Sequence, residues 1–276
     1  MRFEEFAQQP DDGMDLLRGA VLVAAELEPS VDVEAVVAAV KALGEPLAAR
    51  RAALDAMPIR SRCEEVGVFF SKTLGFKGNT ESYDDPSNSF LHQVLARRTG
   101  IPITLSIVWC EVARHAGLTA RGVSFPGHFL VRVDDEGGEP ILVDPFGDSR
   151  LVDEETAKQI FDRAVQGRAP FGRRWFAPAP PRQILFRMFS NLHARYSPLD
   201  PSRAFVCADR KLMLVPDSRD ALRERATLAM RLGAADTARS DIDRLVELDP
   251  TDDTVPLLRA RLARLTSTPP PRKPLH

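Results

Sequence analysis

Cysteine is scarce in this chain of 276 residues, which has only Cys63, Cys110 and Cys207. The three are far apart, odd in number and form no CxxC pair, so their spacing argues against both a disulfide framework and a cysteine-based metal site. We therefore expect a reduced, cytoplasmic protein.

Long apolar runs and an excess of charge of one sign are also missing. The apolar run at residues 20–25 is far too short to cross a bilayer. The acidic first residues lack the basic-then-apolar pattern of a signal peptide. A formal net charge of −2 gives no bulk attraction to DNA or RNA. We expect neither a membrane nor a nucleic-acid partner.

Two further motifs are absent: histidine pairs at zinc-ligand spacing, and a glycine-rich phosphate loop. The sequence thus gives no reason to expect a metal or a cofactor. Its composition, 44% hydrophobic and 28% charged, is ordinary for a globular protein that buries a core. What remains to be explained is the order of its elements and a few polar residues.

Apolar residues at helical spacing predict helices across residues 14–75. The first, 15–28, stops at Pro29. The second, 32–54, has Asp32 as a candidate N-cap. A third, 62–74, ends before a glycine, and a loop rich in turn residues follows it.

A short helix closed by Gly100 precedes a longer one at residues 101–117. Pro102 suits the first turn of the longer helix, and Gly117 suits its C-terminal cap. Apolar side chains fall on two opposite faces of this helix. It should therefore pack on both sides, as a buried central helix does.

Three strands are predicted next, at 119–125, 128–135 and 139–146, the last two joined as a hairpin. Residues 151–177 have a mixed pattern that favours no single element. A buried helix before an antiparallel sheet makes this part of the fold α+β.

The C-terminal part has an internal repeat. Pro216 and Pro250 are 34 residues apart, and so are Ala204 and Ala238. A 34-residue period with a closing proline is typical of tetratricopeptide helical hairpins, although two prolines and two alanines can also coincide. Two units are fewer than a free-standing solenoid needs, so we expect them to dock on the preceding domain.

This pattern predicts three parts of the chain: a core with N-terminal helices at 1–176, repeat-like helices at 184–265, and a disordered tail at 266–276. The proline-rich stretch at 177–183 marks the boundary between the first two.

The candidate chemistry lies in the hairpin. His128 opens one predicted strand and Asp144 closes the next, so antiparallel pairing brings both to the same end of the sheet. The carboxylate could then fix the imidazole tautomer, which is half of a nucleophilic triad. The alternative is structural: Asp144 starts a turn, and His128 caps a strand.

Several segments resemble a known family. The run NSFLHQVLARRTGIPITLSIVWCEVARHAGLTARGVSFPGHFLVRV, with ILVDPF after it, is similar to the transglutaminase-like domain of SirB-type bacterial proteins. The resemblance covers nearly the whole chain. It implies a papain-like, transglutaminase-like α+β core in the cytoplasm, followed by tetratricopeptide-like helices. It also implies that His128 and Asp144 occupy the histidine and aspartate positions of the superfamily's catalytic site.

The cysteine nucleophile of that superfamily has no counterpart. The resemblance places it about four turns ahead of Gly117, where this chain has Pro102, Ile103 and Thr104. Thr104 could act as a weak nucleophile, but N-terminal capping explains it more simply. Cys110 lies about 10 Å further along the helix, where it should be a small buried core residue.

Two functions remain open. The missing thiol favours a non-catalytic module that binds a peptide or protein partner through the old cleft and the repeat helices. The alternative is an acyl-transfer enzyme or peptide-bond hydrolase that uses His128 and Asp144, with Thr104, water or Cys110 as the nucleophile.

Overall fold

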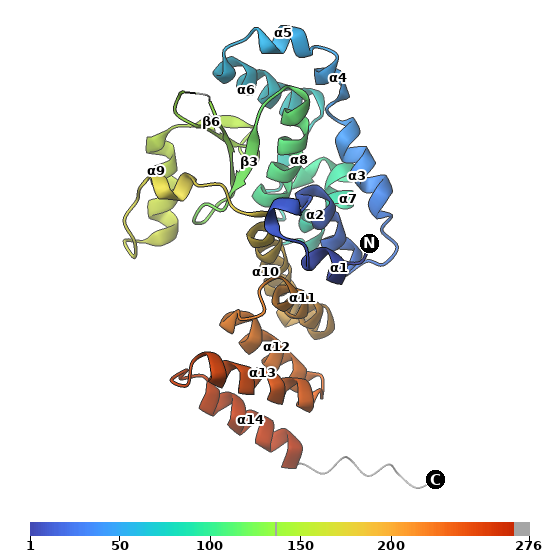
Figure 1. Ribbon diagram of the computed structural model, residues 1–276, viewed down its shortest axis with the longest axis vertical. Coiled ribbons are helices and arrows are strands. Elements are labelled where there is room, and N and C mark those ends of the chain that lie inside the picture. The colour runs from blue at the N-terminus through green and yellow to red at the C-terminus, as the bar shows by residue number, and fades with distance from the viewer. Residues whose placement is uncertain (136, 268–276) are drawn as a thin grey trace. The chain divides into compact units, whose positions relative to one another are not determined.

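The structure, a computed structural model, describes residues 1–135 and 137–267. The polypeptide separates into two compact units, residues 1–188 and 189–276, and each is described by itself (Figure 1). Residues 268–276 of the expected tail lie outside the described part. Among the described residues, no helix combines the length and the hydropathy that a membrane span requires.

The first unit is built mainly of short helices around one long one. The α-helices that lie in it or begin in it are α1 (Phe3–Ala7), α2 (Leu16–Ala25), α3 (Val33–Ala42), α4 (Glu45–Ala48), α5 (Arg51–Asp55), α6 (Ile59–Val68), α7 (Leu91–Arg97), α8 (Pro102–His115), α9 (Glu154–Val165) and α10 (Pro181–Leu199). Single turns of other helix types are η1 (Asp11–Gly13), η2 (Phe69–Thr73), η3 (Pro86–Ser89) and η4 (Arg173–Phe176).

Polar side chains cap the starts of several of these helices. The Asp32 carboxylate accepts from the Ala35 N–H at 3.0 Å, which confirms the predicted cap of α3. The single helix predicted at 32–54 is wrong, however, because this segment breaks into α3, α4 and α5. Gly44 lies so close to the His115 ring that a Cβ there would be 2.3 Å from it, and Pro46 then starts the short α4.

The helix before α8 also ends earlier than the sequence indicates. It stops at Arg97, and Arg98 rather than Gly100 takes the left-handed conformation at φ 54°. The Arg98 guanidinium lies over the Phe76 ring, 4.8 Å from its centroid. Gly100 instead belongs to a two-residue strand, β2 (Thr99–Gly100), which pairs in parallel with β1 (Lys77–Gly78).

The predicted central helix is confirmed in α8. Residues on every side of it are buried, among them the fully buried Leu105, Trp109 and Val112. The helix contacts α2 and α3 from the N-terminal region and also the antiparallel sheet. It is therefore the element on which the rest of the first unit packs.

The three predicted strands are confirmed, and a fourth extends the sheet. The order is β3 (Ala120–Val123), β4 (Leu130–Val133), β5 (Ile141–Asp144) and β6 (Arg150–Val152), all antiparallel. Figure 1 shows the sheet between α8 and α9, and a cluster of buried side chains joins its far face to α9. The sequence pattern predicts neither β6 nor α9, because both fall in or next to the mixed segment at 151–177.

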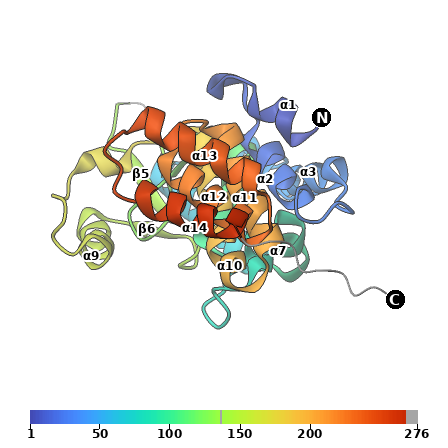
Figure 2. The ribbon, with the colours of Figure 1, turned by 90° about the horizontal axis from the view of Figure 1, so that it is seen from below.

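The second unit continues α10 and adds four helices. They are α11 (Pro201–Leu214), α12 (Arg219–Arg231), α13 (Ala235–Leu248) and α14 (Val255–Ser267). Figures 1 and 2 both show α12, α13 and α14 side by side. Helices α11 and α13 begin 34 residues apart, and Ala204 and Ala238 are fully buried in them.

Trp109 gives a test of the α8 packing. Its side chain is fully buried, and its indole N–H has no hydrogen-bond partner among the described residues. We expect Trp109→Ala to lower the free energy of unfolding by about 3–5 kcal/mol through the cavity it leaves. Trp109→Phe should cost clearly less, because it also removes an unsatisfied buried donor. Urea denaturation of both variants checks this, and equal losses would contradict it.

Candidate functional site

His128 is held in place by a tight turn. The His128 N–H donates to the Phe125 carbonyl at 3.1 Å, with Pro126 and Gly127 between them. Gly127 has φ 70°, so the turn has the type II pattern that takes proline and then glycine. A Cβ on Gly127 would lie 2.5 Å from the Ala164 Cβ of α9. Both the backbone angle and this close packing require glycine at the position before His128.

Asp144 lies at the end of β5 and starts the next turn. The Gly147 N–H donates to the Asp144 carbonyl at 3.1 Å, and the Phe146 N–H donates to the Asp144 carboxylate at 3.1 Å. Such a side-chain bond two residues along is the usual way in which aspartate begins a turn. The predicted turn at Asp144 is therefore confirmed, and it fixes one carboxylate oxygen in the direction of β4.

The two side chains meet, as the hairpin pairing predicts. His128 Nε2 lies 2.8 Å from Asp144 Oδ1. Burial acts to raise the pKa of Asp144, but the hydrogen bond and charge of His128, together with the charge of Arg150, outweigh it and leave the pKa below its ordinary value. An ionised carboxylate only accepts, so Nε2 carries the proton and Nδ1 is the nitrogen left for other chemistry.

The pair lines an open cleft of about 820 Å³. The walls come from the residues before β4, the end of β5, the start of β6, α9 and the loop after β1. The lining residues are Thr80, Gly127, His128, Asp144, Phe146, Gly147, Asp148, Arg150, Ile160, Arg163 and Ala164. His128 Nδ1 has no hydrogen-bond partner among the residues that the structure describes. The volume is in the range of ordinary ligand sites.

Arg187 of α10 braces the His128 turn from behind. Its guanidinium donates to the Ser124 hydroxyl at 2.9 Å, to the Phe125 carbonyl at 3.2 Å and to the His128 carbonyl at 2.7 Å. It also lies over the Phe129 ring. One partly buried cation thus satisfies carbonyls that the turn leaves without strand partners.

Thr104 has a different environment. Its hydroxyl is fully buried, accepts from the Ile101 N–H at 3.2 Å and donates to the Asn88 carbonyl at 2.8 Å. The capping explanation is therefore confirmed. Thr104 is not among the residues that line the His128 cleft. Its role as a nucleophile stays a prediction that this geometry does not favour.

Asn88 links this helix end to the loop beside the cleft. Its buried side-chain amide donates to the carbonyls of Ser82 and Tyr83, and its carbonyl oxygen accepts from the Asn79 amide at 3.0 Å. Because Thr104 bonds the Asn88 backbone, the start of α8 and the loop at 79–83 share one hydrogen-bond network.

Cys110 lies away from the imidazole, as its place in the helix predicts. It lines a separate pocket with Ile107, Glu111 and Gly122, on a part of α8 that faces α2 and α10. Burial raises the pKa of the Cys110 thiol to about 12. A thiol of that pKa is not a thiolate at neutral pH. Cys110 is only partly buried, however, so the prediction of a fully buried core residue is wrong.

The sequence pattern does not point to several residues of the cleft. Arg150 pairs with Asp144 across β5 and β6, and Phe146 and Arg163 supply an aromatic edge and a second cation. Arg150 and Phe146 lie in or just beyond the turn after Asp144. A prediction of the turn and of β6 would have placed Arg150 opposite Asp144. Nothing in the mixed segment points to Arg163.

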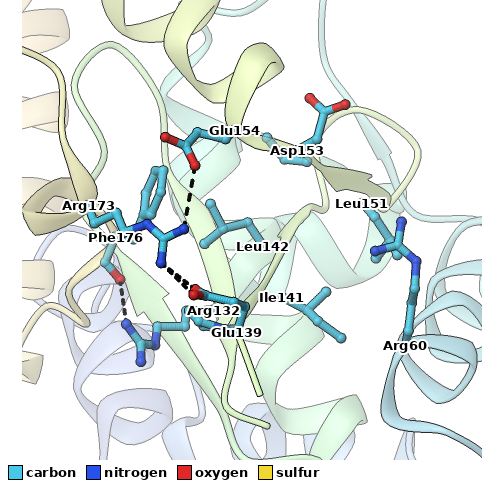
Figure 3. Close-up of a pocket in the computed structure, with 12 residues that line it drawn as sticks. Arg60, Arg132, Glu139, Ile141, Leu142, Leu151, Asp153, Glu154, Arg173 and Phe176 are labelled. Carbon is cyan, nitrogen blue, oxygen red and sulfur yellow. Dashed lines mark hydrogen bonds and ion pairs between the residues drawn. The ribbon is translucent and has the colours of Figure 1, made fainter.

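A second pocket, of about 470 Å³, lies beside β5 and β6 without His128 or Asp144 (Figure 3). Ile141, Leu142 and Leu151 form its apolar part, and Arg173 bonds Glu139 across it. In the described residues, no group of three histidine, cysteine, aspartate or glutamate side chains is arranged to hold a metal.

This geometry defines an α+β core with a histidine–aspartate pair in an open cleft. The family model of the Transglutaminase-like superfamily matches residues 33–190, more than half of the sequence and all of this site. The chain belongs to the transglutaminase-like superfamily.

Relatives match over almost the full length. A "UPF0162 protein" of Xylella fastidiosa is 35% identical over 269 residues, 96% of this chain and 95% of that protein. A "UPF0162 protein" of Vibrio cholerae is 27% identical and covers 92% of this chain and 94% of its own length. "F-box only protein 21" of Mus musculus is 28% identical over 83% of this chain, which is 40% of that protein. No solved structure is significantly similar.

The Asp144 carboxylate gives a pH test. Its pKa is lowered in the folded state, so its stabilising contribution is complete above the ordinary aspartate pKa of about 3.9 and is lost as the pH falls through the folded value. We expect Asp144→Asn to lower the free energy of unfolding at pH 7 by about 1–3 kcal/mol. The loss should stay constant from pH 7 to about pH 5 and shrink as the pH falls below about 3.9. Urea unfolding measures it, with Asp12→Asn on an exposed turn as the control.

Arg187 is a positioning residue by this geometry. Arg187→Met keeps much of the side-chain length but removes the donor of the His128 carbonyl and leaves the Phe125 carbonyl with the His128 N–H alone. We expect a loss of about 1–3 kcal/mol in unfolding free energy. The His128 ring resonances in NMR spectra should also broaden or shift. An unchanged His128 spectrum would show that Arg187 stabilises the fold without positioning the imidazole.

Proposed function

We propose that this protein is a non-catalytic, SirB-type member of its superfamily, whose cleft binds a peptide segment of a protein partner. The observation that carries the proposal is the separation of the dyad from any thiol: His128 and Asp144 line the cleft, whereas Cys110 lines another pocket. A thiol with a pKa of about 12 in a different cavity does not supply covalent catalysis to His128.

The cleft has the size and the polar groups for peptide binding. About 820 Å³ accommodates a few residues of an extended peptide. His128 Nδ1 offers one hydrogen-bonding position of fixed orientation, because Asp144 holds the other side of the ring. A fixed polar group beside apolar walls is the usual basis for specificity in such sites.

The C-terminal helices would add contact surface. Under this proposal, α11 with α12 and α13 with α14 are two tetratricopeptide-like hairpins. The 34-residue offset between α11 and α13 and the complete burial of Ala204 and Ala238 support the assignment. The partner is then a cytoplasmic protein that contacts both units.

The unoccupied Nδ1 also favours a second candidate, a hydrolase of peptide bonds. His128 would take a proton from water through Nδ1 while Asp144 holds the tautomer, and the resulting hydroxide would add to the peptide carbonyl. The C–N bond of the adduct would then break, and His128 would return the proton to the leaving amine. This chemistry needs no thiol. It differs from binding in its product, since a cleaved peptide replaces an intact one.

A displayed library of peptides about 12 residues long tests both candidates. Peptides enriched on the wild-type protein should bind it in fluorescence anisotropy and should bind His128→Ala at least about tenfold more weakly, because the fixed imidazole is lost. His128→Gln serves as a second variant, and circular dichroism checks that both remain folded. Arg173→Gln, in the pocket of Figure 3, is the matched control and should bind normally.

Two outcomes would contradict the binding proposal. If no enriched peptide depends on His128, the cleft is not a peptide site. If mass spectrometry shows that enriched peptides are cleaved by the wild type and not by His128→Ala, the hydrolase replaces the binding module.

A further inference from the structure

Two arginines of the cleft have no close carboxylate partner of their own. The Arg163 Nε donates to the Gln159 carbonyl at 3.1 Å, and no carboxylate of the described residues forms an ion pair with this guanidinium. Arg150 is exposed, and its nearest carboxylate oxygen, on Asp144, is 3.8 Å away. Because Asp144 is already bonded to His128 at 2.8 Å, it neutralises Arg150 only weakly.

The pocket in Figure 3 shows the opposite arrangement. There Arg173 bonds both oxygens of Glu139 at 2.6 and 2.7 Å and lies 3.7 Å from Glu154. Arg132 is bonded to Asp134 at 2.7 Å. Arg173 and Arg132 are thus paired with carboxylates at this pocket, whereas Arg150 and Arg163 are left open in the His128 cleft, so the two pockets differ in the charge that they offer a ligand.

The rest of the cleft is apolar or nearly neutral. The Phe146 ring meets the His128 ring edge-on, with 6.0 Å between centroids, and the half-exposed Tyr83 packs edge-on against Phe146 at 5.9 Å. Ile160 supplies an aliphatic surface from α9. Asp148 is the one cleft carboxylate without a partner among the described residues, against two open cations.

Given the peptide-binding function proposed above, we propose that the cleft selects acidic peptide segments, with Arg150 and Arg163 binding carboxylates while Phe146 and Ile160 contact the neighbouring apolar side chains. Guanidinium groups bind carboxylates through paired N–H donors, which is the geometry that these two side chains leave available. The carboxylates belong either to aspartate and glutamate side chains or to the C-terminus of the peptide.

The displayed library tests this on the intact protein. It is selected in parallel on the wild type, on the double variant Arg150→Gln with Arg163→Gln, and on Arg173→Gln. We expect peptides from the wild type and from Arg173→Gln to be enriched at least about twofold in aspartate and glutamate over the starting library, because open guanidinium groups bind carboxylates. Peptides selected on the double variant should show no such enrichment.

Synthetic versions of the enriched peptides then separate the two sources of carboxylate. Replacing each acidic residue by its amide should weaken binding at least about tenfold if side chains are recognised. Amidating the C-terminus should do so if the terminus is recognised. Either result supports the inference, and both effects should diminish as salt is raised from about 50 to 300 mM, because exposed charges are screened.

Two outcomes distinguish a wrong carboxylate preference from a wrong peptide-binding function. If enriched peptides depend on His128 but are not acidic, and if the double variant selects the same peptides, peptide binding stands and the carboxylate preference is wrong. If no peptide depends on His128, peptide binding itself is wrong.

Discussion

The contact between His128 and Asp144 depends on the register of two short strands. Val131 pairs with Val143, so the residues that precede β4 and those that end β5 emerge at one end of the sheet. A shift of one residue in either strand would send Asp144 to the opposite face and separate the pair. Burial on both faces of the sheet fixes the register, with α8 on one side and α9 on the other. The local chemistry thus follows from the packing of the whole first unit.

The turns at the two strand ends convert this register into a rigid site. Gly127 allows the His128 turn to lie against α9, and Arg187 satisfies its carbonyls from α10. The Asp144 turn holds its own carboxylate through the Phe146 N–H. The His128 ring and the Asp144 carboxylate are therefore already ordered before a ligand binds, which lowers the entropic cost of binding.

The sequence predicts the elements that depend on a regular apolar period or on a local turn. The buried α8, the three strands and the proximity of His128 to Asp144 all follow from apolar spacing and from the Pro-Gly and Asp-Pro pairs. It does not predict the features that are determined by contacts between residues distant in sequence. The break after α3 depends on Gly44 packing against His115, residues distant in sequence, and the left-handed Arg98 is stabilised by an aromatic ring some distance along the sequence. Arg163 enters the cleft only because α9 packs on the sheet, which no local pattern in that segment reveals.

The hydrogen bond from Thr104 to Asn88 has a consequence for substitutions at position 104. Thr104 lies in the first turn of α8, and its hydroxyl ties that turn to the Asn88 backbone, whose side chain in turn holds the loop at 79–83. A cysteine at this place would offer a weaker and longer hydrogen bond through sulfur. Thr104→Cys would therefore add a thiol but would also loosen the loop that forms part of the cleft wall. A functional cysteine at this position would therefore need a second, compensating change that keeps the loop in place.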